Sequence, residues 1–107
     1  MKMTVEEALQ KLGSQSLPFL QLFRHGSMSV EIYQPLEVDR QQPHLQDEIY
    51  VIIRGTGMFQ HGSDQYPFAP GDLIFVAAGV EHHFFNFTPD FSTWVIFYGA
   101  AGGEALE

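Results

Sequence analysis

Short apolar runs alternate with turn-forming residues along most of the chain. After Leu17, the runs are separated by Gly, Pro, Asp and Asn at intervals of about 8–12 residues, which is typical of β-sandwiches and barrels. Helical periodicity does not interrupt them, so we expect antiparallel pairing between neighbouring strands. Seven runs carry the pattern: SVEIYQP, EIYVIIRG, GMFQHG, QYPFAPG, DLIFVAAG, HHFFNFTP and STWVIFYG. The pattern predicts an all-β protein.

One short helix is predicted before the first strand. Thr4 and Glu7 have the spacing of a capping box, in which each side chain satisfies the backbone N–H of the other residue. Apolar residues then recur at helical spacing. Gly13 stands where the glycine just past a helix is expected. These signals predict a helix over about residues 4–12.

Length and composition fit one domain that covers residues 1–107. A chain of 107 residues is long enough for one domain and too short for two. Hydrophobic residues make up 45% of the chain and ten of them are phenylalanines, which is enough for a buried core. We expect the barrel to span about residues 17–99, followed by a flexible C-terminal tail, GAAGGEALE.

Charge and apolar run length exclude several classes of partner. The net charge is −8 with only five Lys and Arg, which argues against nucleic acids and anionic membrane surfaces. The absence of cysteine excludes disulfides and thiolate metal ligands. The longest apolar runs have eight residues, whereas a membrane-spanning helix needs about 20, and the N-terminus is too acidic for a signal peptide. We expect a cytoplasmic protein.

The stretch QPHLQDEIYVIIRG places potential metal ligands directly before a β-branched run. His44 and Glu48 are four residues apart, but Pro43 and the run that follows disfavour a helix. In one straight strand, four residues span about 13 Å, which is too far for two ligands of one ion. Both side chains can serve one site if residues 45–47 turn, so that His44 ends one strand and Glu48 begins its antiparallel neighbour. Gln42 then shares the side of His44.

A further donor has to come from elsewhere, and the stretch GVEHHFFNF is the candidate. His82, Phe84 and Asn86 alternate with a second set of residues, so one set points inward and the other outward. The second set is His83, Phe85 and Phe87. This stretch alone does not decide between the two sets. The plain alternative is that these histidines and acidic residues are surface, core or turn residues without a metal.

Together, the two stretches resemble the motifs of the cupin superfamily. The first cupin motif has two histidines one residue apart, three or four residues, a glutamate, six residues and a glycine; Gln42–Gly55 matches it with Gln42 in place of the first histidine. The second motif also has a fixed order: glycine, five residues, proline, one residue, glycine, two residues, histidine, three residues and asparagine. Gly71–Asn86 matches it with Ala77 in place of the proline. The resemblance covers about residues 29–99.

This resemblance implies a double-stranded β-helix, in which two antiparallel sheets close into a conical barrel around a metal ion. It implies that His44, Glu48 and His82 are ligands of one divalent transition metal: Fe, Mn, Ni or Zn. For Gln42, three roles stay open: a weak fourth ligand, a hydrogen-bonding group for a substrate or a metal-bound water, or the mark of a site that has lost its metal.

The family's common activities suggest a dioxygenase or an isomerase that acts on a small, largely apolar or carbonyl compound. Tyr50, Phe84 and Asn86 are expected to line its binding pocket. Because no catalytic group beyond the ligands is evident, the sequence does not decide whether the protein is an enzyme. The alternatives are a non-catalytic barrel that binds or senses a small molecule, with or without metal, and a purely structural barrel.

The expected oligomer is a homodimer. A small barrel has exposed sheet edges, and natural proteins usually cover such edges. The predicted helix and the strands near residues 17–33 can cover one edge, or exchange with a second copy across a two-fold axis.

Overall fold

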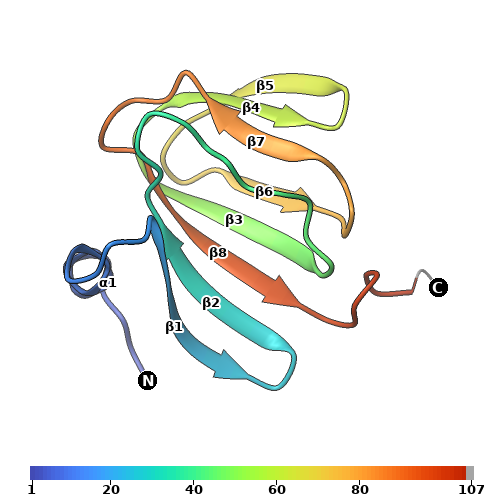
Figure 1. Cartoon of the computed structure of the whole chain (residues 1–107), viewed down its shortest axis with the longest axis horizontal. Helices are drawn as coiled ribbons and strands as arrows, with labels where there is room; N and C mark the ends of the chain where they lie inside the picture. Colours follow the sequence, from blue (N-terminus) through green and yellow to red (C-terminus); the bar gives the residue numbers. More distant parts are fainter. Residues whose placement is uncertain (106–107) are drawn as a thin grey trace.

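The computed structural model describes residues 1–105 and contains one helix and eight strands (Figure 1). The elements are α1 (Val5–Gly13), β1 (Phe19–His25), β2 (Met28–Tyr33), β3 (Asp47–Arg54), β4 (Gly57–His61), β5 (Asp64–Phe68), β6 (Leu73–Val76), β7 (His82–Phe85) and β8 (Ser92–Tyr98). In this part of the chain, no helix is long and apolar enough to cross a membrane.

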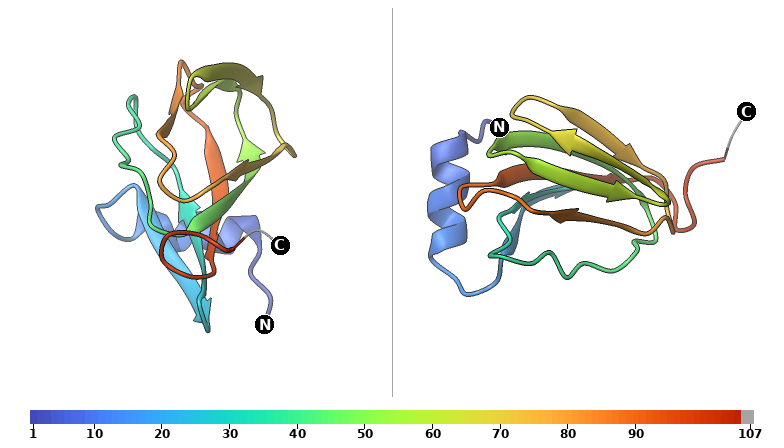
Figure 2. Two further views of the ribbon diagram at one scale, coloured as in Figure 1. Left: turned by 90° about the vertical axis from the view of Figure 1, so that its right-hand side faces the viewer. Right: turned by 90° about the horizontal axis from the view of Figure 1, so that it is seen from above.

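The strands form two antiparallel sheets. The larger has the order β1-β2-β8-β3-β6, and the smaller has the order β5-β4-β7. Figures 1 and 2 show the smaller sheet beside β3 and β6, whereas β1 and β2 extend away from it at the other end. The predicted all-β class and the cupin-type barrel are confirmed. The remaining strand, β1, is not among the seven apolar runs that the pattern identified.

Aromatic side chains fill the space between the two sheets. Tyr50, Phe59, Phe84 and Phe91 are at most 1% exposed and belong to one buried cluster. Along β3, inward residues alternate with half-buried outward ones, as expected for a strand that covers a core. Phenylalanine side chains therefore form much of the barrel core.

The glycine that ends the first motif is required by packing. Gly55 has a φ of +86°, which disfavours residues with a side chain. A Cβ at this position would also lie 2.6 Å from the Cα of Phe91. Gly55 thus lets the β3–β4 connection pass directly over the core.

Helix α1 begins as predicted and ends one residue later. Both hydrogen bonds of the Thr4–Glu7 capping box are present. Gly13 is the last helical residue, so its predicted place just past the helix is wrong. Ser14 caps this end instead, because its hydroxyl and its N–H both reach the carbonyl of Lys11. The helix packs through buried side chains against Ile32 of β2; these are Ala8 and Leu12.

The first part of the predicted flexible tail is fastened to the barrel. The N–H of Gly102 donates to the carbonyl of Leu45 at 2.6 Å, and the N–H of Glu104 donates to the carboxylate of Asp47 at 2.9 Å. These two bonds hold the chain after β8 against the start of β3. The last two residues of the predicted tail, 106 and 107, lie outside the described residues.

Candidate metal centre

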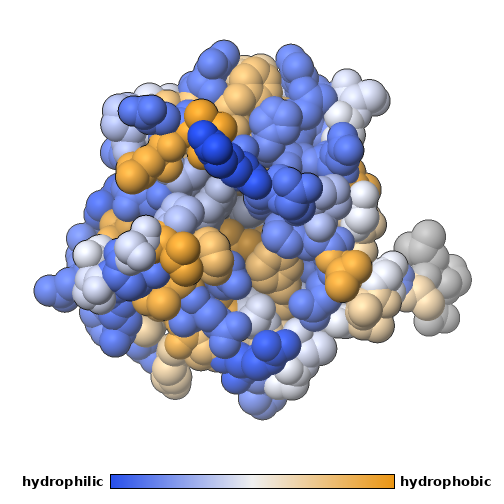
Figure 3. All heavy atoms as spheres, viewed as in Figure 1, coloured by the Kyte–Doolittle hydropathy of each residue, from blue (hydrophilic) through white to orange (hydrophobic). Residues whose placement is uncertain are grey.

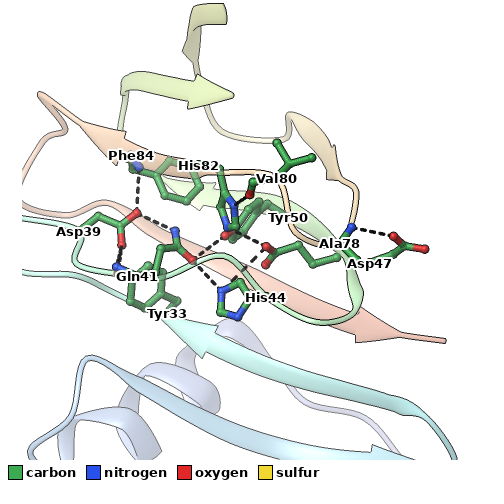
Figure 4. A network of polar contacts seen from close by, with 11 residues as sticks. Tyr33, Asp39, Gln41, His44, Asp47, Tyr50, Ala78, Val80, His82 and Phe84 are labelled. Atoms are coloured by element: carbon green, nitrogen blue, oxygen red, sulfur yellow. Dashed lines mark hydrogen bonds and ion pairs between the residues drawn. The ribbon is translucent and has the colours of Figure 1, made fainter. Parts of the chain in front are cut away.

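Three potential metal ligands meet inside the barrel, although they come from different parts of the fold (Figure 4). His44 lies in the connection between β2 and β3, Glu48 is on β3, and His82 begins β7. One ligand atom of each residue lies within 4.8 Å of the other two. The Nε2 atom of His82 is 2.7 Å from Oε1 of Glu48, and Nε2 of His44 is 3.9 Å from the same oxygen.

The connection that carries His44 is irregular, which differs from the prediction. Residues 34–46 contain no strand, so His44 does not end one. A bend at residues 45–46 still brings His44 beside Glu48. Prolines explain the difference, because each lacks the N–H that a sheet ladder needs. The carbonyl of His44 instead accepts from the N–H of Gly79, at 2.8 Å, which ties the two motif stretches together.

The buried pair of His82 and Glu48 has polar atoms that no other group satisfies. Nδ1 of His82 is 2.8 Å from the carbonyl of Val80, and this carbonyl can only accept a hydrogen bond. Nδ1 therefore carries a proton, which directs the Nε2 atom toward Glu48. Among the described residues, neither Nε2 of His82 nor either carboxylate oxygen of Glu48 has a hydrogen-bond partner of good geometry. Such buried atoms need a cation between them, either a proton or a metal ion.

The two histidines differ in their electrostatic surroundings. Burial lowers the pKa of His82, but the Glu48 carboxylate and the Val80 carbonyl together raise it above its usual value. Burial lowers the pKa of His44, and the charge of Glu48 only partly opposes this effect. A metal ion therefore competes with a proton less strongly at His44 than at His82. The residues present fit a divalent cation.

The structure places Gln41, rather than Gln42, beside the candidate ligands. Oε1 of Gln41 is 3.2 Å from Nε2 of His44 and accepts a hydrogen bond from the Tyr50 hydroxyl at 2.9 Å. Gln42 is exposed. The alternation of side chains along a strand predicted the same side for Gln42 and His44, but this alternation does not apply in an irregular segment. A metal-binding role for Gln42 stays a prediction.

Asp39 organises this segment and was not identified from the sequence. Asp39 is 8% exposed, and its carboxylate accepts from the Tyr33 hydroxyl, from the side chain of Gln41 at 2.6 Å and from the N–H of Phe84 at 2.8 Å. The last bond joins the segment to β7, as Figure 4 shows. No motif marks Asp39, because the bond that joins it to β7 reaches a residue distant in sequence.

The three predicted pocket residues occupy different environments. Tyr50 and Phe84 are fully buried, and their rings meet edge-on with centroids 4.9 Å apart. Burial, together with the charges of Glu48 and Asp39, raises the pKa of Tyr50, so its hydroxyl remains a hydrogen-bond donor. Asn86 is exposed and has a φ of +51° just after β7. Their role in substrate binding stays a prediction.

A cavity of about 770 Å³ opens next to His44. Its walls come from the α1–β1 connection, the inner faces of β2 and β8, and the irregular segment. Glu31 of β2 lines it without a hydrogen bond or ion pair from its side chain to any described residue. Burial, and to a smaller extent the charge of Glu48, raises the pKa of Glu31. No sequence pattern marked Glu31, because alternation in a strand does not reveal an open cavity.

With the fold and the site described, comparison with known proteins identifies the class. The model of the cupin domain family matches residues 29–97, and the chain belongs to this family. An uncharacterised protein of Streptomyces coelicolor is 35% identical over 81 residues, which cover 74% of this chain and 77% of the relative.

Two solved structures illustrate the shared fold. A cupin superfamily protein from Desulfitobacterium hafniense superimposes with a TM-score of 0.62 at 14% identity, over 75% of this chain and 74% of that one. A putative mannose-6-phosphate isomerase from Ralstonia eutropha gives a TM-score of 0.62 at 20% identity, over 77% of this chain and 83% of that one.

Proposed function

We propose that the protein is a metal-dependent enzyme in which His44, Glu48 and His82 bind one divalent transition metal: Fe, Mn, Ni or Zn. The observation that carries this proposal is the set of unsatisfied buried atoms on Glu48 and His82, which a cation would satisfy. Two histidines and one carboxylate leave coordination positions open for a substrate. The expected substrate is a small, largely apolar or carbonyl compound.

Glu31 favours an isomerase-type reaction over oxygen chemistry. A metal bound at this site supplies a Lewis acid for a carbonyl oxygen. Glu31, on the cavity wall, would take the proton from a hydroxyl-bearing carbon next to this carbonyl group and return it to the carbonyl carbon, while the hydroxyl proton passes to the former carbonyl oxygen, so no atom is gained or lost. Burial raises the pKa of its carboxyl group, which makes the protonated form more accessible to a group that must both accept and donate a proton. The cavity is also lined by the apolar side chains of Val95 and Phe97, which suit a largely apolar substrate.

Solvent exchange in D₂O tests this proposal directly. The protein, loaded in turn with Mn(II), Fe(II), Ni(II) or Zn(II), is incubated with pyruvate, acetoin and glyceraldehyde, and deuterium incorporation next to the carbonyl group is followed by NMR. We expect exchange in the wild type, loss in Glu31→Gln, and no change in Glu81→Gln, whose side chain is exposed. Oxygen uptake without exchange would instead support the dioxygenase.

The alternative is a barrel that binds or senses a small molecule without turnover. The exposed apolar residues Leu17 and Leu36, which line the same cavity, favour it, because they provide a surface for capture. Metal and ligand binding without exchange or oxygen uptake would support this alternative.

A homodimer is the proposed assembly. β6 is the edge strand of the larger sheet, and its outward side chains Leu73 and Phe75 are 71% and 49% exposed. Two neighbouring outward residues on β3 are their cross-strand partners: Val51 and Ile49. Apolar patches also appear on the face that Figure 3 shows. Burying such patches against a second copy favours association.

A cytoplasmic location remains the expectation from the sequence.

A further inference from the structure

The amide of Gln41 has only one chemically sensible orientation. Its nitrogen lies 2.6 Å from the Asp39 carboxylate, which can only accept a hydrogen bond. The reverse orientation would place two acceptors in contact. Oε1 of Gln41 therefore faces the candidate metal ligands, and the buried Asp39 holds it there.

One lone pair of this oxygen faces the ligand cluster. A carbonyl oxygen has two lone pairs, and one of them accepts from the Tyr50 hydroxyl at 2.9 Å. The other faces Nε2 of His44, 3.2 Å away. If Nε2 of His44 binds a metal, it has no proton to give to Gln41. The two acceptors can then stay this close only if both of them bind the same cation.

The spacing fits shared coordination. Ligand atoms about 2.1 Å from one ion lie roughly 3.0–3.4 Å apart at octahedral or tetrahedral angles. The separation of 3.2 Å between Gln41 and His44 falls within this range. Oε1 of Glu48, however, lies 2.7 Å from Nε2 of His82 and 3.9 Å from Nε2 of His44, so this carboxylate has to shift when an ion binds. Gln42 is exposed and no hydrogen bond joins its side chain to a described residue.

We propose that Oε1 of Gln41 is the fourth protein ligand of the metal, and that Gln42, which stands at the position of the family's first motif histidine, is not a ligand. This proposal rests on the metal site proposed above. The resulting set contains two imidazoles, one carboxylate and one amide oxygen. Replacing an imidazole by an oxygen donor favours harder ions, so the site selects Mn(II) or Fe(II) over Cu(II) and Zn(II) relative to a site with three histidines.

Two adjacent glutamines provide a matched test. The full-length protein is titrated with Mn(II), and the free ion is measured by its EPR signal for the wild type, Gln41→Ala and Gln42→Ala. We expect affinity to fall at least about tenfold in Gln41→Ala, because a directly bound donor is lost, and to change less than about twofold in Gln42→Ala. The visible spectrum of bound Co(II) should change in Gln41→Ala alone.

A second variant separates ligand loss from loss of packing. Gln41→Met keeps the length of the side chain but replaces the hard oxygen with a soft thioether, which binds Mn(II) poorly. We expect it to bind Mn(II) as weakly as Gln41→Ala although its side chain still fills the space. Both variants lose the hydrogen bonds to Asp39 and Tyr50, so both should melt below the wild type, and the loss of Mn(II) affinity is compared at a temperature where both are folded.

The outcomes distinguish this proposal from the one on which it rests. Wild-type affinity in Gln41→Ala or Gln41→Met, or an equal loss in Gln42→Ala, would overturn the role of Gln41 and leave the metal site standing. A wild-type protein that binds none of the four metals would overturn both proposals.

Discussion

The buried pair of Glu48 and His82 provides metal ligands at a cost to the stability of the metal-free protein. Each side chain is 1% exposed, so removing one partner leaves the other buried without compensation. We expect His82→Ala to abolish metal binding and to lower the free energy of unfolding of the metal-free protein by about 3–5 kcal/mol. Elemental analysis and urea unfolding measure the two effects.

Two comparisons complete this test. His83→Ala removes the exposed histidine next to His82, and we expect it to change neither quantity. Glu48→Met combined with His82→Phe removes both polar groups, and we expect neutral or increased stability without metal. A stable His82→Ala variant that still binds stoichiometric metal would contradict the assignment.

Asp47 gives the fold a defined sensitivity to acid. Hydrogen bonds from the N–H groups of Glu104 and Ala78, both at 2.9 Å, lower the pKa of its carboxyl group. A carboxyl group with a depressed pKa stabilises the fold above its unfolded pKa, near 3.9, and this contribution is lost as the pH falls through the folded pKa. We expect Asp47→Asn to be less stable than the wild type at pH 7, and the difference to shrink below about pH 4.

Urea unfolding of both proteins at several pH values between 7 and 2 measures this difference. Asp64→Asn serves as the control, because Asp64 is exposed and its side chain makes no hydrogen bond to a described residue. A stability difference for Asp47→Asn that stays constant down to pH 2 would refute the proposed role of the carboxylate.

At the residue level, the sequence predicted the candidate ligands that lie in motifs but not their surroundings. The spacing of two motifs identifies His44, Glu48 and His82, and the structure brings these three together. Gln41 was missed because the alternation of side chains expected for a strand indicated Gln42, and this alternation does not hold where the chain is irregular. Glu31 was missed because its importance comes from the cavity rather than from its neighbours in the chain.

The irregular segment 34–46 depends on Asp39 for its position. No sheet ladder holds this segment, and Asp39 joins it to β7 through the N–H of Phe84 at 2.8 Å. In Asp39→Asn, the amide NH₂ must face either this N–H or the groups that donate to the carboxylate, such as the Tyr33 hydroxyl. We expect a loss of about 1–3 kcal/mol in unfolding free energy and weaker Mn(II) binding.

Hydrogen exchange localises this effect. We expect the amides of residues 34–46 to exchange faster in Asp39→Asn than in the wild type. The exchange rates of the core amides of β3 and β8 should change only as far as the free energy of global unfolding changes. Asp90→Asn is a suitable control, because Asp90 is exposed and its carboxylate bonds to Thr88, away from the segment. Unchanged exchange in the segment would contradict an anchoring role for Asp39.

At the level of elements, the regular parts of the fold could be predicted and the connections could not. Apolar alternation predicted seven strands, and the Thr4–Glu7 spacing predicted the start of α1, because both signals are local. The segment 34–46 and the residues after β8 are held by hydrogen bonds between distant parts of the chain, such as the bond from Glu104 to Asp47. Local patterns carry no information about such bonds.

For the whole molecule, the outward face of β6 predicts how two copies associate. Leu73 and Phe75 pair across the strand boundary with Val51 and Ile49 of β3, so apolar side chains extend over more than one strand. This face lies on the edge strand of the larger sheet, which also leaves backbone groups available for pairing. We therefore expect the wild type to sediment as a dimer of twice 12.1 kDa.

A charge on this face should separate the copies. Leu73→Lys places an ammonium group where the second copy would bury an apolar side chain, and burying an unpaired charge is costly. We expect a 12.1 kDa species in sedimentation, with metal content unchanged because β6 carries none of the three candidate ligands. Leu36→Lys is the matched control: Leu36 is 78% exposed but lies in the segment between β2 and β3. A dimer that survives Leu73→Lys but not Leu36→Lys would move the interface to the mouth of the cavity, where a second copy would control access to the metal centre.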